Sequence, residues 1–590
     1  MGFKSYVLLA VLWTWTAGGS LLSGETIERL DRVAEAVMSC KLNAGLTIAM
    51  VKNDTTVLTR GYGSRDLQRD LPMTNTTPTS IGSLSKAFTA TLIADGVARG
   101  LFTWDTPLRD IIPGFGMVGD FRTQRVSMRD ALSHKMGIPS YWGVTTACLN
   151  VSRTELVRRM RHFPPIHDFR SQFRYCNYGY VLAGHALEVK EGKSWEQIVK
   201  EKIFRPLGME TARTADDIRT DEDWRLAAWS HTPLTDGTNL SRNPDQFQAP
   251  LISEIGPGGS VYAAAEDMAK WMRFHLREGK NESGHQLIDA RQLRETYSPT
   301  SVSGSRSQTR ARFPVDDVSF TYGMAWRNGM YRGLEKIFHT GSYSSHNCKM
   351  TLLPAADLGV WACVTSPGDS RGSGAVNVMN MYMLDILLGK EPWLNASTVC
   401  SYPEPWRSMS ASKTSMPDEG KVDEDDEIIG GETSTQEKAS SMMVNTFDVQ
   451  NKHQYIGIYK HRAFGDFHVY EDVNGTMRYK MGLFLNGALS ALEREDRLNM
   501  TIEYPLHYRT VSQTGRTLHF SQKATVDLTM KYTRVTVPYL ESSLPPVFER
   551  SLAVPSSPPP STPGAASAPG AHHFSLLILF ISLTCGVPLF

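Results

Sequence analysis

IGSLSKAF, residues 81–88, places a serine and a lysine three positions apart in an otherwise apolar stretch. Hydrophobic side chains recur at helical intervals from Leu84 onward, so we expect a helix that begins here and ends at Arg99–Gly100. On such a helix Ser83 and Lys86 share a face, and a desolvated lysine could take the proton of the serine hydroxyl. The same spacing recurs at 410 and 413 in a polar segment, so spacing alone does not establish catalysis.

Two further motifs follow this pair along the chain. Tyr175-Cys176-Asn177 lies in FRYCNYGYVLAG, and His339-Thr340-Gly341 lies in the strand-like stretch KIFHTGSYSSHN. Ser-x-x-Lys, Tyr-x-Asn or Ser-x-Asn, and Lys/His-Thr/Ser-Gly, in this order, are the signature of the serine β-lactamase and penicillin-binding-protein superfamily. The sequence resembles this superfamily over about residues 25 to 390. It is most similar to the class C branch, which includes D-aminopeptidases, D,D-peptidases, esterases and animal β-lactamase-like proteins.

The resemblance implies an α/β fold of the β-lactamase/transpeptidase type, a sandwich of an antiparallel sheet flanked by helices, with an all-helical lobe. The residue patterns agree, because GLTIAMVKNDTTVLTRGYG (45–63) predicts a hairpin and strand patterns return in KMTLLPAADLGVWACVTS (349–366). We therefore expect one sheet to join both ends of a hydrolase domain spanning residues 25–400. Helices are expected in TELVRRMRHF (154–163), GYVLAGHALEVKEG (179–192) and AEDMAKWMRFHLREG (265–279).

The rest of the chain divides by composition. Residues 401–445 contain a dense acidic run and are expected to form a disordered linker. Residues 446–545 show strand-like alternation and an Asn474–Gly475 turn signal, which predicts a small all-β, barrel-like accessory domain. Its opening, YIGIYKHRAFGDFHVY, resembles the accessory barrels that follow such hydrolase domains. Residues 546–573 are a Pro/Ser stalk, and residues 574–590 are a hydrophobic tail.

The resemblance implies that Ser83 attacks a carbonyl and forms an acyl-enzyme. Lys86 and Tyr175 would share the proton transfers, with Tyr175 passing a proton toward the leaving group and later helping to activate water. A phenol with a pKa of about 10 needs adjacent cations for this role, and Lys86 and His339 could supply them. Ser85, which stands between the pair, is expected to face another side of the helix.

The resemblance also implies a set of substrate-binding groups. Asn177 would hydrogen-bond a carbonyl or amide of the substrate, and Gly341 would let the substrate approach the strand closely. The backbone N–H groups of Ser83 and Ser342 would form the oxyanion hole. His339 is a departure, because most β-lactamases and transpeptidases have a lysine there, whose permanent charge binds a carboxylate. Histidine occurs at this position in esterase and aminopeptidase members, so we expect esterase-like or peptidase-like hydrolysis rather than true β-lactamase activity.

Composition and charge narrow the partners. The chain has 62 Lys and Arg against 61 Asp and Glu, a net charge of +1, so we expect no binding to nucleic acid. No metal-ligand motif accompanies the three motifs, and the implied chemistry needs no metal and no other cofactor. The expected partners are a small-molecule or peptide substrate and, through the C-terminal tail, a membrane. No protein partner is indicated.

Both ends of the sequence indicate the secretory pathway. Lys4 and the apolar run Tyr6–Trp15 are typical of a signal peptide, which we assign to residues 1–24, with an uncleaved signal anchor as the alternative. The tail resembles the signal for a glycosylphosphatidylinositol (GPI) anchor, and a short transmembrane helix is the alternative. Either alternative places the protein at the cell surface, membrane-anchored, on the extracellular side.

Sequons and cysteines agree with that compartment. Cys348 and Cys363 flank LLPAADLG symmetrically, so a hairpin there would set them on facing strands, either as a disulfide or as two buried thiols. The six cysteines outside the tail permit 15 pairings, which leaves the connectivity open: Cys40, Cys148, Cys176, Cys348, Cys363 and Cys400. Eight Asn-x-Ser/Thr sequons are the predicted glycosylation sites: Asn53, Asn75, Asn150, Asn239, Asn281, Asn395, Asn474 and Asn499.

Two functions are consistent with these features. The first is a secreted or membrane-tethered serine hydrolase that cleaves an amide or ester bond through an acyl-serine intermediate. The alternative is a catalytically weak or inactive protein of the same fold that serves as a binding or scaffolding protein, since a fold does not guarantee its usual activity.

Overall fold

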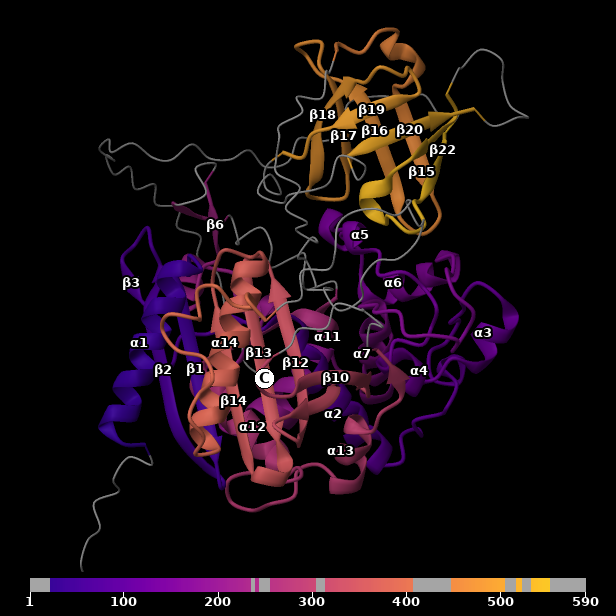
Figure 1. The fold of residues 1–590 in the computed structure, drawn as a ribbon. Coiled ribbons are helices and arrows are strands. Elements are labelled where there is room, and N and C mark those ends of the chain that lie inside the picture. The colour runs from indigo at the N-terminus through magenta and orange to yellow at the C-terminus, as the bar shows by residue number, and fades with distance from the viewer. Residues whose placement is uncertain are drawn as a thin grey trace, which may run out of the picture. The chain divides into compact units, whose positions relative to one another are not determined.

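One antiparallel sheet joins the two ends of the domain predicted at residues 25–400 in the computed structural model (Figure 1), as the sequence predicts. The structure describes residues 22–234, 239–243, 255–303, 313–406, 447–503, 516–522 and 532–551. The central pairing sets β1 beside β14, which are far apart in the sequence. In order across the sheet, the nine strands are β3 (Leu71–Pro72), β2 (Thr55–Asp66), β1 (Gly45–Lys52), β14 (Leu358–Val364), β13 (His346–Leu353), β12 (Leu334–Tyr343), β11 (Arg327–Tyr331), β10 (Asp317–Tyr322) and β9 (Ser301–Val302).

Helices cover both faces of this sheet. On one face, α14 (Ser370–Leu387) packs on β13 and β14, and α1 (Gly24–Cys40) packs against α14. On the other face, α12 (Ala265–Leu276) contacts β1, β2 and β14. Because both faces are covered, every residue of β13 and β14 is buried.

The three helices expected from the sequence are present. The segment 154–163 forms α6 and a short 3₁₀ turn, 179–192 forms α7, and 265–279 holds α12. Gly192 ends α7 with φ of +66°, a left-handed conformation that glycine adopts without strain. The helices whose bounds are not given above are α2 (Ser85–Ala98), α3 (Asp120–Arg125), α4 (Met128–Leu132), α5 (Trp142–Ala147), α6 (Arg153–Arg159), α7 (Tyr178–Glu191), α8 (Trp195–Val199), α9 (Asp221–Leu226), α11 (Gly256–Gly259) and α13 (Ala290–Tyr297).

The accessory domain is a closed antiparallel barrel, as the strand pattern predicts. The Asn474–Gly475 turn connects β16 to β17, and Gly475 has φ of +78°. The last strand lies beyond the expected end at residue 545 and pairs with both β15 and β21, so the barrel includes the first residues assigned to the stalk. The strands are β15 (Gly457–His461), β16 (Gly465–Glu471), β17 (Met477–Met481), β18 (Leu485–Ala491), β19 (Arg497–Met500), β20 (Thr517–Ser521), β21 (Arg534–Thr536) and β22 (Val547–Arg550).

Two disulfides resolve the open cysteine pairing. Cys348 and Cys363 are directly opposed on β13 and β14 and form a cross-strand disulfide, which is the first of the two alternatives. Cys40 at the end of α1 is bonded to Cys400, 360 positions later in the chain. Cys148 and Cys176 are buried and belong to neither disulfide.

Several predicted segments lie wholly or mostly outside the described residues. These are the signal peptide, the acidic linker beyond residue 406, the stalk beyond residue 551 and the hydrophobic tail. Within the described ranges, no helix combines the length and apolar character needed to cross a membrane.

Candidate active site

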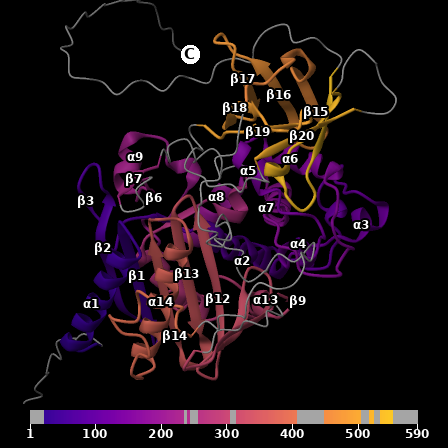
Figure 2. The same cartoon turned by 45° about the horizontal axis from the view of Figure 1, so that its top comes forward.

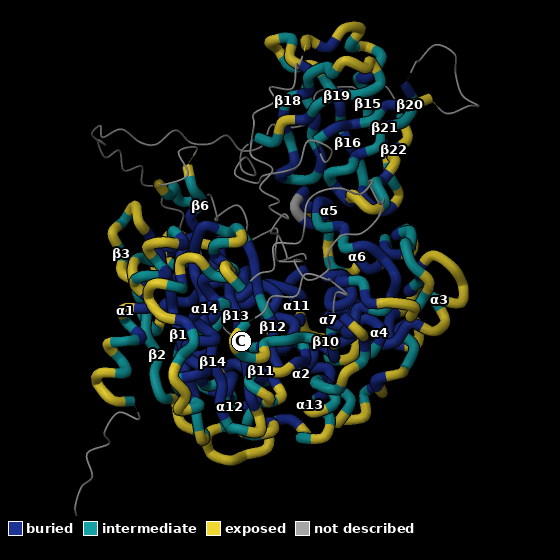
Figure 3. Tube along the Cα trace, viewed as in Figure 1, coloured by how far each residue is buried: buried dark blue, intermediate teal, exposed yellow. Residues whose placement is uncertain are grey.

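Ser83 lies at the start of a buried helix. The helix α2 begins at Ser85, so Ser83 occupies the preceding 3₁₀ turn, η1 (Gly82–Leu84). Most of α2 is buried (Figure 3), and it packs against α7, α11 and α13. Figure 2 labels α2, α7 and α13. Lys86 is therefore fully buried, and its Nζ lies 3.0 Å from Ser83 Oγ. The expected shared face of the pair is present.

Three oxygen atoms surround the Lys86 amine. Besides Ser83 Oγ, Nζ lies 2.6 Å from Asn177 Oδ1 and 2.8 Å from the Gly258 carbonyl oxygen. Burial lowers the pKa of Lys86 well below its ordinary value. A neutral amine has two N–H donors, which Asn177 and Gly258 can accept, and one lone pair, which can face the Ser83 hydroxyl. The arrangement thus suits Lys86 to accept the serine proton.

Tyr175 reaches the same serine oxygen from a second element. It lies just before α7, and its Oη donates a hydrogen bond of 3.0 Å to Ser83 Oγ. Lys86 Nζ is 4.9 Å from the centroid of the Tyr175 ring. Ser83 can accept this hydrogen bond while it donates to Lys86, so the three groups form one continuous proton path.

Ser85 points away from this path, as expected. Its Oγ accepts a hydrogen bond from the backbone N–H of Val261 at 3.0 Å. Asn177 begins α7, and its Oδ1 is bonded to Lys86, while Nδ2 has no hydrogen-bond partner among the described residues. That amide group is free for the predicted bond to substrate, which stays a prediction.

Beyond Phe338, the edge of β12 that faces away from β13 has no neighbouring strand among the described residues, and β12 contacts η1. Pairing with β11 ends at Phe338, and the β12–β13 hairpin closes at Tyr343 and His346. In such a hairpin the N–H of Ser342 points away from β13, because alternate residues face opposite edges of a strand. The N atom of Ser342 lies 2.8 Å from the place that a Cβ on Gly82 would occupy. The backbone therefore brings the two predicted oxyanion-hole segments into contact.

Gly341 is required by this contact. A Cβ at this position would lie 1.9 Å from the Ile81 carbonyl oxygen. Gly341→Ala is expected to push η1 from β12, to slow Ser83 acylation about 100-fold and to lower the free energy of unfolding by about 1–3 kcal/mol. Active-site labelling rates and denaturant unfolding measure both effects.

Gly374→Ala is the matched control. Gly374 lies within α14, and a Cβ added there would meet only the Lys41 side chain, at 3.9 Å or more. Alanine at this position should leave the labelling rate unchanged and stabilise the helix by up to about 1 kcal/mol. If the Gly341→Ala variant is labelled at the wild-type rate, the site tolerates a displacement of η1, and the expected role of Gly341 is wrong.

His339 does not supply the cation expected beside Tyr175. Burial, together with the nearby positive charge of Arg327, lowers the pKa of His339 to about 3. Its Nε2 lies 3.0 Å from Tyr322 Oη, and its Nδ1 lies 2.5 Å from the Thr340 carbonyl oxygen. The ring is neutral and engaged at both nitrogens, so that expectation is corrected.

Two side chains that the sequence reasoning did not single out complete the surroundings. The His134 ring packs against Tyr175, with centroids 4.2 Å apart, and Tyr322 lies between His134 and His339. His134 stands in ALSHKMGIPSY (131–141), between the first and second motifs, and this place in the sequence is the only signal that could have indicated it. No sequence signal indicated Tyr322, because it reaches the site only through the pairing of β10 with β11.

The predicted glycosylation sites differ in exposure. Asn75 is half-buried, and its Nδ2 donates to Glu266 Oε1 at 2.6 Å. Asn281 and Asn499 are also half-buried, and the remaining five sequon asparagines are exposed: Asn53, Asn150, Asn239, Asn395 and Asn474. Modification of any of them stays a prediction.

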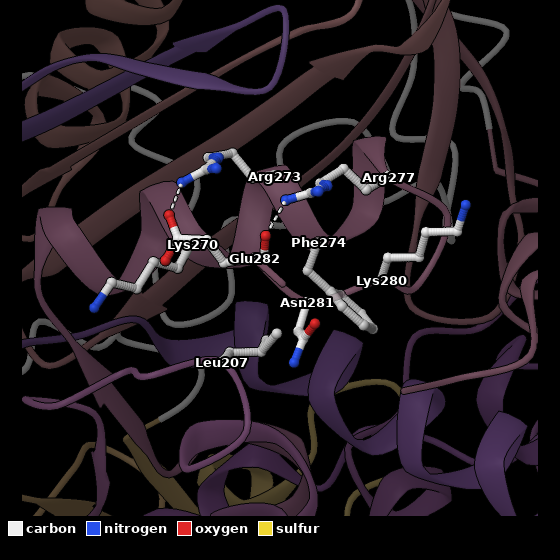
Figure 4. A pocket seen from close by; sticks show the side chains of 8 residues that line it. All are labelled: Leu207, Lys270, Arg273, Phe274, Arg277, Lys280, Asn281 and Glu282. Atoms are coloured by element: carbon white, nitrogen blue, oxygen red, sulfur yellow. Dashed lines mark hydrogen bonds and ion pairs between the residues drawn. The ribbon is translucent and has the colours of Figure 1, made fainter. Parts of the chain in front are cut away.

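A separate small pocket lies at the C-terminal half of α12 (Figure 4). Its lining includes four basic side chains, of which Arg273 pairs with Glu282 at 2.9 Å. None of the predicted catalytic or substrate-binding residues lines it. Among the described residues, no group of three or more His, Cys, Asp and Glu is arranged to hold a metal ion.

A helix-flanked antiparallel sheet with a lysine and a tyrosine converging on a serine defines the class of serine-nucleophile proteins of the β-lactamase/transpeptidase type. The sequence profile of the family described as Beta-lactamase matches residues 30–379, more than half of the chain. The chain belongs to this family.

Relatives and solved structures agree with that assignment. An unguisins hydrolase of Aspergillus campestris is 26% identical over 355 residues, which are 57% of this chain and 61% of the relative. A D-aminopeptidase of Brucella anthropi is 29% identical over 251 residues, 41% of this chain and 44% of the relative. The chain thus spans less than two thirds of either relative. The octameric penicillin-binding protein homologue from Pyrococcus abyssi covers 86% of this chain and 97% of its own, at 19% identity and a TM-score of 0.51, a likeness of fold.

Proposed function

We propose that this protein is a serine hydrolase that cleaves an amide or ester bond through an acyl-Ser83 intermediate. The observation that carries the proposal is the convergence of Lys86 Nζ and Tyr175 Oη on Ser83 Oγ, each at 3.0 Å, in a buried site. Relatives named as hydrolases and a D-aminopeptidase support it.

The proton path gives the order of steps. Neutral Lys86 takes the proton of Ser83 as Oγ forms a bond to the substrate carbonyl carbon, and the N–H groups of Ser83 and Ser342 stabilise the oxyanion. Tyr175 donates its proton to the leaving nitrogen or oxygen as that bond breaks, and recovers a proton from Lys86. In the second half, Tyr175 takes a proton from water as it passes its own proton to neutral Lys86, and the water oxygen bonds to the ester carbonyl carbon. Lys86 then returns that proton to Ser83 Oγ as the bond between Oγ and carbon breaks and the acid leaves.

The charges beside the site indicate which substrates to compare. His339 is neutral, whereas Arg327 is half-buried and its guanidinium lies 5.8 Å from the centroid of the Tyr322 ring. That guanidinium has no hydrogen-bond or ion-pair partner among the described residues. A substrate carboxylate would therefore find its counter-charge in Arg327 rather than in His339. This supports including substrates with a free carboxylate beside their uncharged amides.

A substrate panel tests the proposal. The purified chain is incubated with p-nitrophenyl esters, D- and L-aminoacyl amides, peptides with free or amidated C-termini, and nitrocefin. We expect hydrolysis of esters or amides, little turnover of nitrocefin, and an acyl adduct on the Ser83 peptide after acid quenching. Turnover without an adduct on this peptide, or no turnover of any member, contradicts the proposal.

One observation favours the scaffolding alternative. Ser83 exposes only 2% of its surface, so little of the nucleophile is open to a substrate in this structure. A protein that never admits substrate would give neither turnover nor adduct in the same panel.

We also propose that the protein acts at the cell surface, tethered through its C-terminal tail. The supports are the signal-like residues 1–24, the apolar tail and the sequons. Release from intact cells by a phosphatidylinositol-specific phospholipase is expected for a GPI anchor. Retention after that treatment indicates a transmembrane tail, and an intracellular protein contradicts the proposal.

A further inference from the structure

A continuous chain of hydrogen bonds runs beside the candidate active site. His134 Nδ1 lies 3.0 Å from the backbone N of Cys176, and His134 Nε2 lies 3.3 Å from Tyr322 Oη. Tyr322 Oη lies 3.0 Å from His339 Nε2, and His339 Nδ1 lies 2.5 Å from the Thr340 carbonyl oxygen. The three side chains are buried, with 1% of their surface exposed at most.

The two ends of this chain fix its direction. The Cys176 N–H can only donate, so His134 Nδ1 accepts and Nε2 carries the proton of the neutral ring. The Thr340 carbonyl can only accept, so His339 carries its proton on Nδ1 and accepts at Nε2. Tyr322 then accepts from His134 and donates to His339. Burial lowers the pKa of both histidines, which keeps both rings neutral. The hydrogen bonds at the two ends place the two ring protons on different nitrogens, so the rings are opposite tautomers.

The chain connects two segments that carry groups of the proposed mechanism. At one end, the His134 ring packs against Tyr175, and Cys176 is the next residue. At the other end, Thr340 stands two residues before Ser342 on β12. The first segment precedes α7 of the helical lobe and the second belongs to the sheet, so these bonds tie the two parts of the domain together next to Ser83.

We propose that His134 and Tyr322 are positioning residues that fix the distance between Tyr175 and the oxyanion donor Ser342. This inference rests on the proposed function, although the chain of bonds is present without it. His134 has φ of +60°, a conformation costly for most residues, which marks a backbone held for a specific contact. His339 acts here through Tyr322, not by touching the substrate.

The tautomers can be observed without any activity. In the full chain labelled with ¹⁵N-histidine at pH 7, we expect His134 to be protonated at Nε2 only and His339 at Nδ1 only. The variants His134→Asn and His339→Asn assign the two sets of signals by their loss. The inference is overturned by a doubly protonated ring or by the same tautomer in both rings.

Kinetics then test the positioning role. Tyr322→Phe removes the central hydroxyl, and His134→Asn keeps an acceptor for the Cys176 N–H in a residue that tolerates positive φ. Each variant should lower kcat about 10- to 100-fold with KM changed less than about 2-fold, and the double variant should lose no more than either single one. Additive losses, or an effect on KM alone, contradict a shared positioning chain.

Tyr331→Phe is the matched control. Tyr331 is equally buried, lies on β11, and its Oη is 2.8 Å from Asp385 Oδ1 in the core on the other face of the sheet. Its loss should reduce stability by about 1 kcal/mol and leave kcat unchanged. If the wild type shows the opposite tautomers but never labels or turns over, the proposed function fails while the chain of bonds stands. If it turns over and the tautomers differ from those expected, only this inference fails.

Discussion

Replacing Ser83 by alanine is expected to abolish labelling by a fluorophosphonate probe and to lower hydrolysis by about 10⁴-fold or more. Both proton-transfer groups act on one atom, Ser83 Oγ, so removing it leaves Lys86 and Tyr175 with nothing to activate. The fold should survive, because the change removes one oxygen atom and adds no bulk. In-gel labelling and the hydrolysis rate measure the loss, and thermal unfolding verifies the fold.

Ser85→Ala provides the control from the same helical turn. Ser85 Oγ accepts a hydrogen bond from the backbone N–H of Val261. Losing this bond should lower the free energy of unfolding by about 1–2 kcal/mol and leave labelling intact. Equal labelling of wild type and Ser83→Ala would exclude Ser83 as the nucleophile and leave the scaffolding alternative. If Ser85→Ala loses labelling at wild-type stability, Ser85 rather than Ser83 is the nucleophile.

The ordered motifs were sufficient to predict the site's central atoms. Ser83 and Lys86 are fixed by local helix geometry, and Tyr175 was reached through its motif, since spacing within one helix cannot indicate a partner from another element. The same reasoning predicted the sheet, because the nearly continuous apolar runs of β1 and β14 are typical of strands buried on both faces.

The parts that were missed depend on contacts between distant segments. The Cys40–Cys400 bond joins residues 360 positions apart, and composition cannot select it among 15 pairings. The sequence did not indicate Tyr322 for the same reason, because the pairing of β10 with β11 brings it to the site. The charge of His339 was misjudged because a pKa is set by burial and neighbours, which the residue type does not reveal. The barrel's end was placed too early because β22 is short and follows prolines that read as a stalk.

Lys86→Met is expected to slow acylation of Ser83 by about 10³-fold or more, because it removes the proton acceptor and keeps a side chain of similar length. In wild type, the labelling rate should rise with pH as the ammonium of Lys86 loses its proton, through a pKa below its ordinary value. The variant should show no such rise. Stopped-flow labelling across a pH series measures both effects.

Lys349→Met is the control for burial itself. Lys349 on β13 is buried with its Nζ 2.8 Å from Asn377 Oδ1, and desolvation lowers its pKa to about 8. Since its unfolded pKa is higher, the unfolded chain binds more protons between about pH 8 and 10.5, and wild-type stability should rise with pH across that window. Lys349→Met should weaken this rise and leave labelling unchanged.

The comparison of the two lysines separates a catalytic role from a structural one. Both are buried amines with lowered pKa values, and only Lys86 lies within reach of the serine oxygen. If Lys86→Met labels at the wild-type rate with the wild-type pH dependence, the proton of Ser83 must go elsewhere. Tyr175, whose Oη lies 3.0 Å from the same oxygen, would then have to accept the proton as a phenolate.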